Sequence, residues 1–461
     1  MHLTDDDTPQ LRIAMIGGGL MAKSHALAYR NVQAVYGSVP LRPALSLLVD
    51  ASEELASATA RSLGFQRWAT DWQEAVDDPG IDLIDIVTPN WLHYEVAMAA
   101  IAAGKHVYCE KPLALTAEDA RRMYEAARDA KVRTLVGFNY LCNPAVVYAR
   151  QLIRGGAIGD VWSFRGFLRL DASTDPDVPF TWRFERARSG SGALGDVGAH
   201  VISLARALVG PIAEVTGLTA TVVPDRPEPA GVFGYGSKAA EGAPRRRVEN
   251  DDIATFLARF SNGAVGTFEA SRVATGSAFE LFIEVIGSKG AVRFSQQDIY
   301  KLELFLAEGD ELQRGFRHVE IGPGHGDYGH FWPFAGSPLG IHELKVIEVH
   351  ELLTALAAGR DPHPGFEEGW RVSTVLDAVE ESASTGKWTT IPRLPADLIA
   401  RGALGGAHET SRQTTTEDRR MCRAGSDRDA AHRVQCPHHR RQHGRVSRYG
   451  PGGVNRRERD H

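Results

Sequence analysis

The chain has 461 residues and a net charge of −6; 43% of its residues are hydrophobic and 24% are charged. This is enough for two ordinary domains with buried cores, and it excludes a wholly disordered protein. The sequence has no apolar run near the roughly 18 residues of a membrane span, no basic-then-apolar export signal and only four scattered cysteines, so we expect a cytoplasmic protein without membrane contact or a disulfide framework.

The first 138 residues alternate short apolar runs with amphipathic segments. The apolar runs are Leu11–Ile16, Ala44–Val49, Ile81–Val87, His106–Cys109 and Thr134–Phe138. The amphipathic segments are Met21–Ala34, Ser52–Leu63, Trp91–Ala103 and Ala117–Ala130, the last with Thr116 as its expected N-cap. This alternation predicts an α/β Rossmann domain over residues 1–138, with a parallel sheet covered by helices on both faces.

A glycine-rich turn follows the first apolar run. Gly17, Gly19 and Ala22 form the pattern G-x-G-x-x-A between a predicted strand and a predicted helix. Gly17 permits a tight turn, Gly19 lets a pyrophosphate approach the backbone, and Ala22 allows the helix to pack closely on the strand. Together with Leu20 and Met21, these residues are expected to bind a dinucleotide at the helix N-terminus. The alternative is a plain glycine turn without a ligand.

The second run ends at Asp50, whose carboxylate can accept hydrogen bonds from both ribose hydroxyls of a dinucleotide and would repel a 2′-phosphate. Asp50 lies further from the glycines than usual, because an insertion at Tyr36–Pro43 lengthens the connection. No Arg or Lys occurs in the following segment, Ala51–Glu54, so NAD is favoured over NADP. Alternatively, Asp50 only caps the next helix.

Two further motifs follow predicted strands: T-P-N-W-L-H, with Thr88, Pro89, Asn90 and His93, and E-K-P, with Glu110 and Lys111. Both lie at the carboxyl ends of strands, which is where open α/β sheets bind ligands. We therefore predict that they line the cofactor site. Each motif alone is a weak signal, because a lysine in a loop is more often a solvated surface charge than a catalyst.

From Asn139 onward the pattern changes to longer strand-like runs joined by hairpin-like turns. The predicted strands are Val161–Leu170, Glu214–Val223, Ile253–Phe260, Ala264–Ala270, Phe279–Ile286, Ala291–Phe294 and Lys301–Leu306, and the predicted helices are Pro144–Arg154, Ile341–Ala358 and a segment near Trp370–Ser384. This predicts an α+β domain over residues 139–392 with a large, mostly antiparallel open sheet. The segment Pro224–Arg247, rich in Pro, Gly and Ala, is expected to be a mobile surface loop.

Asp196 and His200 stand four residues apart in the run G-A-L-G-D-V-G-A-H, so they share a face if this segment is helical. A carboxylate beside an imidazole orients the ring and stabilises its protonated form. On this motif alone, an N-capping Asp196 and a packed His200 are as well supported as a catalytic pair.

In combination, these motifs resemble the glucose–fructose oxidoreductase / inositol dehydrogenase (Gfo/Idh/MocA) family over about residues 11–392. Further runs, including Val136–Tyr140, Ser163–Gly166, Trp182–Phe184 and Gly192–His200, are most similar to the levoglucosan dehydrogenase branch of that family. The resemblance implies an NAD-dependent oxidoreductase that removes a hydride from a secondary hydroxyl of a sugar, anhydrosugar or cyclitol. A homodimer or homotetramer is implied as well.

The resemblance also implies roles for individual residues. Lys111, Asp196 and His200 match the family's catalytic positions, and Tyr140, Trp182 and Arg183 are the implied sugar contacts. The chemistry agrees, because a histidine near its ordinary pKa can accept the hydroxyl proton at neutral pH and an ammonium group favours the developing alkoxide. Nicotinamide carries out the redox step, so no metal is expected.

Two other functions stay open. The same residues support redox-assisted elimination, in which bound NAD is regenerated in every cycle, so net release of NADH separates the two reactions. The third interpretation is a cofactor-binding regulatory protein, and the presence of all three catalytic residues argues against it.

The end of the chain differs from the rest in composition. Residues 401–461 contain 14 Arg, no Lys and 7 acidic residues, a charge of +7, which leaves −13 for the first 400 residues. With few large apolar side chains, residues 393–461 are predicted to form a basic, disordered tail. Its cysteines and histidines, Cys422, Cys436, His438 and His439, fit no common zinc-finger spacing. Its arginines are not interleaved with aromatic residues, so no nucleic-acid partner is expected. We hypothesise that this tail is an altered-frame or read-through extension.

Overall fold

The computed structural model describes residues 8–229 and 239–392, and the statements below concern these residues. The predicted tail, 393–461, lies outside the described residues. Within the described ranges, no helix is long and apolar enough to cross a membrane. The described residues belong to one compact unit, so the boundary expected near residue 138 stays a prediction.

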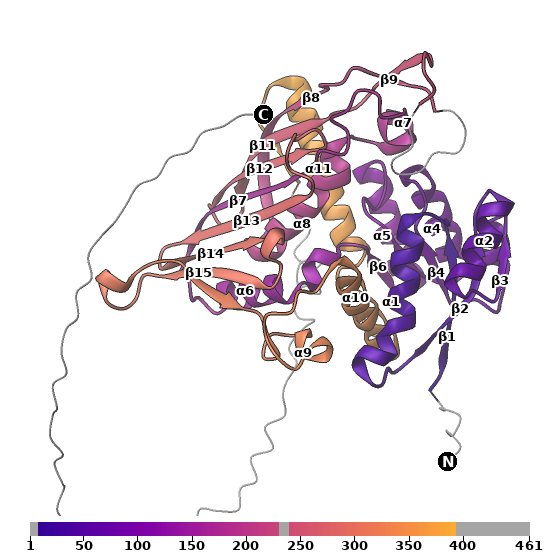
Figure 1. Ribbon diagram of the computed structural model, residues 1–461, viewed down its shortest axis with the longest axis horizontal. Helices are drawn as coiled ribbons and strands as arrows, with labels where there is room; N and C mark the ends of the chain where they lie inside the picture. The colour runs from indigo at the N-terminus through magenta and orange to yellow at the C-terminus, as the bar shows by residue number, and fades with distance from the viewer. Residues whose placement is uncertain (1–7, 230–238, 393–461) are drawn as a thin grey trace, which may run out of the picture. The chain divides into compact units, whose positions relative to one another are not determined.

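The first sheet, within the described residues, has six parallel strands in the order β3-β2-β1-β4-β5-β6 (Figure 1). These strands are β1 (Gln10–Ile16), β2 (Arg42–Val49), β3 (Arg67–Ala69), β4 (Leu83–Ile86), β5 (His106–Cys109) and β6 (Thr134–Val136). The sequence did not indicate β3, because this strand has only three residues and two of them are exposed. The order of strands reverses between β1 and β4, and such a switch point is where open sheets of this type bind ligands.

The helices that connect these strands confirm the predicted alternation. They are α1 (Leu20–Tyr36), α2 (Glu53–Leu63), α3 (Gln73–Asp77), the 3₁₀ turn η1 (Asn90–Leu92), α4 (His93–Ala102) and α5 (Ala117–Ala130). The predicted cap of α5 is present, since the hydroxyl of Thr116 accepts a hydrogen bond of 3.1 Å from the backbone N–H of Asp119.

The described residues after 138 form a second, nine-stranded sheet in the order β16-β15-β14-β13-β7-β12-β11-β8-β17. Its strands are β7 (Val161–Arg169), β8 (Ile212–Ala220), β11 (Ile253–Phe260), β12 (Val265–Ser271), β13 (Glu280–Gly287), β14 (Gly290–Ser295), β15 (Lys301–Leu306), β16 (Arg317–Glu320) and β17 (Thr389–Thr390). Only β7 and β12 pair in parallel, which confirms the predicted mostly antiparallel sheet. The two strands that the sequence did not indicate, β16 and β17, are short and lie at the two edges.

The second part of the described chain also contains helical segments, several of which cover one face of the sheet (Figure 1). They are η2 (Asn139–Cys142), α6 (Pro144–Arg154), η3 (Trp182–Phe184), α7 (Arg186–Ser189), the π-helical turn η4 (Leu194–Gly198), α8 (Ala199–Leu208), η5 (Gln296–Asp298), η6 (Glu311–Gln313), α9 (Tyr328–Phe331), α10 (Ile341–Ala357) and α11 (Phe366–Thr385). Buried residues alternate with exposed ones along β11, and the buried set packs in one core with α8. Within the described ranges, no helix covers the opposite face of this sheet (Figure 1).

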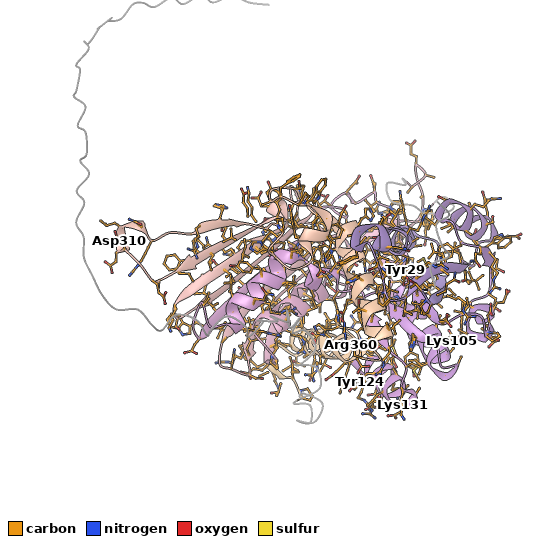
Figure 2. The ribbon with its side chains drawn as sticks, turned by 90° about the horizontal axis from the view of Figure 1, so that it is seen from below. Tyr29, Lys105, Tyr124, Lys131, Asp310 and Arg360 are labelled. Carbon is orange, nitrogen blue, oxygen red and sulfur yellow. The ribbon has the colours of Figure 1, made fainter. Side chains whose placement is uncertain are left out.

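Helix α10 lies beside α1 (Figure 1). Val346 and Val349 of α10 share a core with Ala22, Ala26 and other buried residues of α1. A helix from late in the chain therefore completes the core on one side of the first sheet. In Figure 2, Asp310 lies at the end of the second sheet that is remote from Tyr29 and Lys105 of the first part.

The segment Pro224–Arg247 is not simply a mobile surface loop, which corrects the prediction. Its two ends pair as an antiparallel ribbon, β9 (Asp225–Pro227) with β10 (Arg245–Arg247). Arg226 is fully buried and donates hydrogen bonds to the carbonyl oxygens of Ser173 (2.6 Å) and Asp175 (2.9 Å). The Pro- and Gly-rich composition indicated a loop, but a buried arginine anchors its base. Residues 230–238 lie outside the described residues.

Candidate functional site

The glycine turn joins β1 to α1 at the switch point of the first sheet. Gly17 has a φ of +110°, and a Cβ there would lie 2.8 Å from the carbonyl oxygen of Val87, so this position requires glycine. At Gly19, by contrast, no described heavy atom lies within 4 Å of the position that a Cβ would take. The backbone at Gly19 is therefore open to close approach by a ligand.

Helix α1 begins directly after this turn. No side chain caps its N-terminus at Gly19, so its first backbone N–H groups are available to an anion. Leu20 is 64% exposed, Met21 is half-buried, and Ala22 is fully buried where the helix packs on the sheet. This matches the role expected for Ala22 in close helix–strand packing.

Asp50 lies beside the glycine turn. Its Oδ2 accepts a hydrogen bond from the backbone N–H of Gly18 (2.8 Å), and its Oδ1 accepts one from the backbone N–H of Ser52 (3.1 Å). Ser52 is the N-cap of α2, because its hydroxyl accepts a hydrogen bond from the backbone N–H of Leu55 (3.2 Å). The alternative that Asp50 only caps α2 is therefore wrong, and its carboxylate is held at the turn.

The loop after β4 brings Thr88, Pro89 and Asn90 to the same edge of the sheet. All three are half-buried, and the hydroxyl of Thr88 has no hydrogen-bond partner among the described residues. The side chain of Asn90 donates a hydrogen bond of 3.0 Å to the carbonyl oxygen of Ser189, which follows η3 in the second part of the chain. This loop therefore links the first sheet to the segment that carries Trp182.

His93 is fully buried behind this loop. Its Nδ1 lies 2.9 Å from the carbonyl oxygen of Pro112, and its Nε2 lies 3.1 Å from that of Thr88. Burial lowers the pKa of His93. The imidazole thus joins the Thr88 loop to the Lys111–Pro112 turn from inside the protein.

Glu110 is the centre of a buried charged cluster. Its Oε1 accepts a hydrogen bond from Nζ of Lys345 (2.7 Å) and lies 3.0 Å from Nε2 of His25, while its Oε2 accepts one from the backbone N–H of Lys111 (3.1 Å). Burial alone would raise the pKa of Glu110, but the charges of Lys345 and His25 lower it well below its usual value. The ionised carboxylate holds the backbone of Lys111 in place.

The same cluster joins α1, β4, β5 and α10. The ring of His25 lies 3.0 Å from the carboxylate of Asp85, and Lys345 donates to Glu348 (2.9 Å) and to the hydroxyl of Tyr108 (3.0 Å). The sequence analysis did not identify His25, Asp85, Lys345 or Glu348 as functional. The available signal was a histidine on the buried face of α1, which is apolar apart from Ser24 and the hydroxyl of Tyr29.

Lys111, which follows β5, and Asp196, which lies in the second part of the chain, are in direct contact. Nζ of Lys111 donates to Oδ1 of Asp196 (3.0 Å) and to its carbonyl oxygen (2.6 Å). Burial would raise the pKa of Asp196, but the charges of Lys111 and Arg183 outweigh it and hold this pKa below its usual range. Asp196 stands in η4, a π-helical turn, and not at the N-cap of a helix.

His200 is buried, with 8% of its surface exposed, and its ring packs edge-on against Phe138 and Tyr140. Its Nδ1 has no hydrogen-bond partner among the described residues. Burial and the charge of Lys111 lower the pKa of His200 to about 3. The expectation of an imidazole near its ordinary pKa is therefore wrong, because burial and the charge of Lys111 outweigh the opposing charge of Asp196, which pairs with Lys111.

The three implied sugar contacts occupy different surroundings. Tyr140 is 3% exposed and packs on His200 with ring centroids 4.9 Å apart. Trp182 and Arg183 are half-buried, and the guanidinium of Arg183 lies 4.5 Å from the ring centroid of Trp182. The ring of Trp182 also meets the edge of Trp91, which follows the Thr88 loop. The structure thus brings Trp182 next to the predicted cofactor loop.

These residues fit a dinucleotide. Gly19 leaves space at an uncapped helix N-terminus, Asp50 presents a fixed carboxylate at the turn, and the Thr88 hydroxyl is a buried polar group without a described partner. The uncapped helix N-terminus suits a pyrophosphate, the carboxylate of Asp50 suits a ribose, and the hydroxyl of Thr88 can hydrogen-bond another part of the dinucleotide.

Comparison with known families agrees with this geometry. Residues 11–138 match the oxidoreductase family with an NAD-binding Rossmann fold, and residues 146–293 match the GFO/IDH/MocA C-terminal domain. Among curated proteins, the chain is 40% identical over 388 residues to a levoglucosan dehydrogenase of Pseudarthrobacter phenanthrenivorans, which covers 84% of this chain and 99% of the relative. It is 30% identical over 283 residues to a scyllo-inositol 2-dehydrogenase (NAD(+)) of Bacillus subtilis, covering 61% and 73% of the two chains.

Solved structures give the same result. A levoglucosan dehydrogenase in complex with NADH and L-sorbose aligns with a TM-score of 0.79 at 39% identity, over 84% of this chain and all of the other. A complex of levoglucosan dehydrogenase with NADH and levoglucosan aligns equally well, over 83% of this chain.

Proposed function

The chain belongs to the GFO/IDH/MocA family of NAD-binding oxidoreductases, and from this premise we propose that it oxidises a secondary hydroxyl of a sugar, anhydrosugar or cyclitol with NAD. One observation carries the proposal: the ammonium of Lys111 is held by Asp196 at the carboxyl edge of the first sheet. The neutral imidazole of His200 lies in the same region, and the charge of Lys111 contributes to its lowered pKa.

The cofactor would be held by the glycine turn and the two loops beside it. The residues proposed to hold it are Gly17, Gly19, Leu20, Met21, Ala22, Asp50, Thr88, Pro89, Asn90, Glu110 and Lys111, with His93 acting from behind as the link between the loops. When bound, NAD accepts the hydride that the hydroxyl-bearing carbon loses. Asp50 favours NAD over NADP, since its carboxylate would repel a 2′-phosphate.

The chain's own residues manage the proton and the charge. Lys111 donates hydrogen bonds to the oxygen on which negative charge develops. His200 is neutral and has an unpartnered Nδ1, so it can accept the hydroxyl proton. Its low pKa in the free protein rises as alkoxide character develops beside it, because a nearby negative charge favours the imidazolium. Asp196 keeps Lys111 charged and in place.

We propose an anhydrosugar such as levoglucosan as the first substrate to test, because a relative named for it and a solved complex with it cover 84% and 83% of this chain. Tyr140, Trp182 and Arg183 would contact the sugar. The half-buried Trp182 offers an apolar ring face, and Arg183 offers several donors for hydroxyl groups.

We also propose that the chain works in the cytoplasm as a homodimer or homotetramer. The uncovered face of the second sheet supports an oligomer, since Leu218, Leu257, Val265 and Ile286 are between 36% and 74% exposed there. Sedimentation analysis tests this, and a monomer at micromolar concentration would contradict it. Residues 1–138 and 139–392 are proposed as the cofactor and substrate domains.

The test of function is a spectrophotometric screen for NADH release with levoglucosan, inositols, glucose, galactose and xylose. Net NADH supports dehydrogenation, whereas product formation without NADH would mean elimination. Lys111→Ala and His200→Ala should each lose at least about 100-fold in kcat. NAD binding measured by fluorescence should be largely retained in both, since Lys111 is only one of the residues proposed to hold the cofactor. Wild-type turnover in either variant would contradict the proposed mechanism.

A further inference from the structure

Three consecutive polar residues precede β11 and are buried. Asn250, Asp251 and Asp252 are 3%, 7% and 0% exposed. Buried polar side chains require partners, and a row of three is unusual directly before an apolar strand. The partners of Asn250 and Asp251 lie in the segments that carry Arg183 and Asp196.

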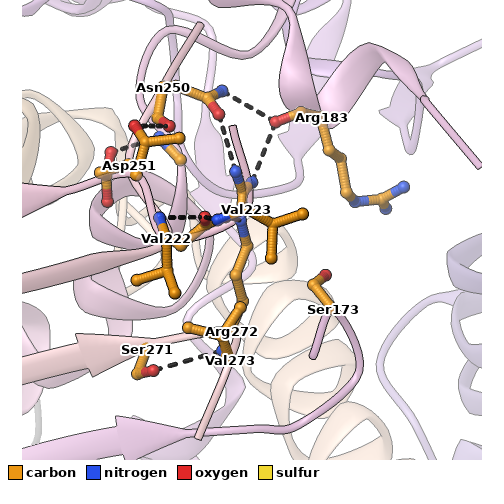
Figure 3. A network of polar contacts seen from close by, with 12 residues as sticks. Ser173, Arg183, Val222, Val223, Asn250, Asp251, Ser271, Arg272 and Val273 are labelled. Atoms are coloured by element: carbon orange, nitrogen blue, oxygen red, sulfur yellow. Dashed lines mark hydrogen bonds and ion pairs between the residues drawn. The ribbon is translucent and has the colours of Figure 1, made fainter. Parts of the chain in front are cut away.

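Asn250 holds the turn of Arg183, as Figure 3 shows. Its Nδ2 donates to the carbonyl oxygen of Arg183 (2.8 Å) and to the hydroxyl of Ser189 (2.7 Å), and its Oδ1 accepts from Arg272 (2.8 Å). Arg272 donates to the same carbonyl oxygen of Arg183 (3.1 Å). The backbone of Arg183 is thus fixed by two donors, while its side chain points away from this network in Figure 3.

Arg272 is itself rigidly held. Its Nε donates to Oδ1 of Asp252 (2.8 Å), and its guanidinium lies 4.5 Å from the ring centroid of Phe184. The guanidinium of Arg226 lies 4.4 Å from the same ring. Phe184 follows Arg183 directly. The turn is therefore held by hydrogen bonds to the carbonyl oxygen of Arg183 and by the stacking of two guanidinium groups on the ring of Phe184.

Asp251 holds the other segment. Its Oδ1 and Oδ2 accept hydrogen bonds from the backbone N–H groups of Gly192 (2.7 Å) and Leu194 (2.8 Å), and its carbonyl oxygen accepts one from Ala193 (3.0 Å). The carbonyl oxygen of Gly192 in turn accepts from the backbone N–H of Asp196 (3.0 Å). The position of Asp196 therefore depends on a chain of backbone bonds that begins at Asp251.

We propose that Asn250 and Asp251 are positioning residues, which together set the distance between the Arg183 turn that would bind the sugar and the Asp196 segment that holds Lys111. Asn250 and Asp251 are adjacent in the chain, so the positions of both segments are fixed relative to the same peptide unit. The link also reaches the first sheet, since Ser189, held by Asn250, accepts a hydrogen bond from Asn90. This proposal rests on the proposed function and deepens it.

The test uses variants that keep volume and remove specific bonds. Asn250→Asp retains an acceptor for Arg272 but loses both donated bonds, and it should raise the KM for the sugar about 10- to 100-fold while the Kd for NAD changes less than about twofold. Asp251→Asn replaces one acceptor by a donor facing a backbone N–H and should lower kcat more than it changes KM. Amide hydrogen exchange should become faster at residues 182–189 in the first variant and at 192–196 in the second.

Asn262→Asp is the matched control, because it too keeps volume, retains an acceptor and loses a donated bond. This asparagine also donates to a carbonyl oxygen, that of Val209 (3.2 Å), but at the exposed turn beyond the other end of β11, so its kinetics and exchange should equal those of the wild type. A lowered unfolding midpoint with unchanged KM in Asn250→Asp would overturn the inference, because the role would then be structural only. If the wild type oxidises no sugar, the proposed function fails, while unchanged exchange at 182–196 in both variants would separately overturn the positioning role.

Discussion

The buried charged cluster around Glu110 allows a direct test through Lys345→Met. Lys345 is 1% exposed and contacts Glu110, Glu348 and the hydroxyl of Tyr108. Methionine keeps most of the volume and removes the charge. Among the described residues, the ring of His25 is then the one cationic group left in ion-pair contact with Glu110.

The expected loss follows from the geometry. Opposite charges 2.7 Å apart attract by about 6 kcal/mol at an effective dielectric constant of about 20, and burial of the ammonium cancels several kcal/mol of this. Removing one partner of a buried pair typically costs about 3–5 kcal/mol. Burial raises the pKa of Glu348, so this residue takes up a proton readily once Lys345 is gone. We therefore expect the lower end, about 3 kcal/mol.

The assay is urea unfolding followed by circular dichroism at several pH values. The lowered pKa of Glu110 means that its stabilisation is complete above about pH 4.3 and is lost as the pH falls through the lowered value. The pKa of Lys345 is raised, because Glu110 and Glu348 outweigh the opposing effect of burial, so its stabilisation is complete below about pH 10.4. The difference between wild type and Lys345→Met should be largest between about pH 5 and 9 and should narrow in acid.

Arg128→Met serves as the control, since it breaks an ion pair in which Arg128 and Asp129 are 48% and 69% exposed and should not shift the midpoint measurably. A loss below about 1 kcal/mol in Lys345→Met at pH 7 would refute the reasoning. So would a loss of the same size at pH 7 and at the most acidic pH at which the wild type still folds, because the effect would then not depend on the ionised carboxylates.

Three further predictions concern the site. The pKa of His200 is lowered to about 3, so its protonation opposes folding and stability falls as the pH falls from about 6.5 towards that value. Lys111→Met should raise this pKa, and an NMR titration of the ring that shows no change would contradict the assigned cause. Asp50→Ala should weaken NAD binding about tenfold and reduce the preference over NADP, measured by fluorescence titration of both nucleotides; an unchanged ratio of the two Kd values would disprove its role. Gly17→Ala, at a φ of +110°, should lower the thermal midpoint, whereas Gly19→Ala should fold normally and lose only dinucleotide affinity; equal midpoints for the two variants would be evidence against the turn geometry.

The fold was predictable wherever local pattern and tertiary environment agree. Buried parallel strands are continuous apolar runs, and α5 carries its cap in the sequence, so these elements were identified nearly to the residue. Strands β3 and β17 were missed because they have three and two residues and depend on pairing alone. The ribbon of β9 and β10 was missed because its composition is that of a loop, and only the burial of Arg226 distinguishes it.

The site was predictable as a set of motifs, and its electrostatics were not. The spacing of Asp196 and His200 indicated a contact between their side chains on one helical face. In the structure η4 is a π-helical turn, and the carboxylate of Asp196 forms an ion pair with Lys111 instead. The pKa of His200 depends on burial and on a lysine 89 positions earlier in the chain, which no local pattern reports. Lys345 is similarly remote from Glu110 in the chain, so the residues around each of them give no indication that the two form an ion pair.

Buried carboxylates place both segments that carry the proposed catalytic residues by binding backbone N–H groups. Glu110 accepts from the N–H of Lys111, and Asp251 accepts from two N–H groups before Asp196. Such bonds fix the backbone while leaving the catalytic side chains able to adjust to a substrate, which lowers the entropic cost of reaching a reactive geometry. A buried carboxylate is costly unless it is paired. Lys345 pairs with Glu110, whereas Asp251 depends on the backbone N–H groups of Gly192 and Leu194, and burial still raises its pKa. Stability and the positioning of Lys111 are therefore linked through Lys345 and Glu110, and variants of Lys345 should lose stability and turnover together.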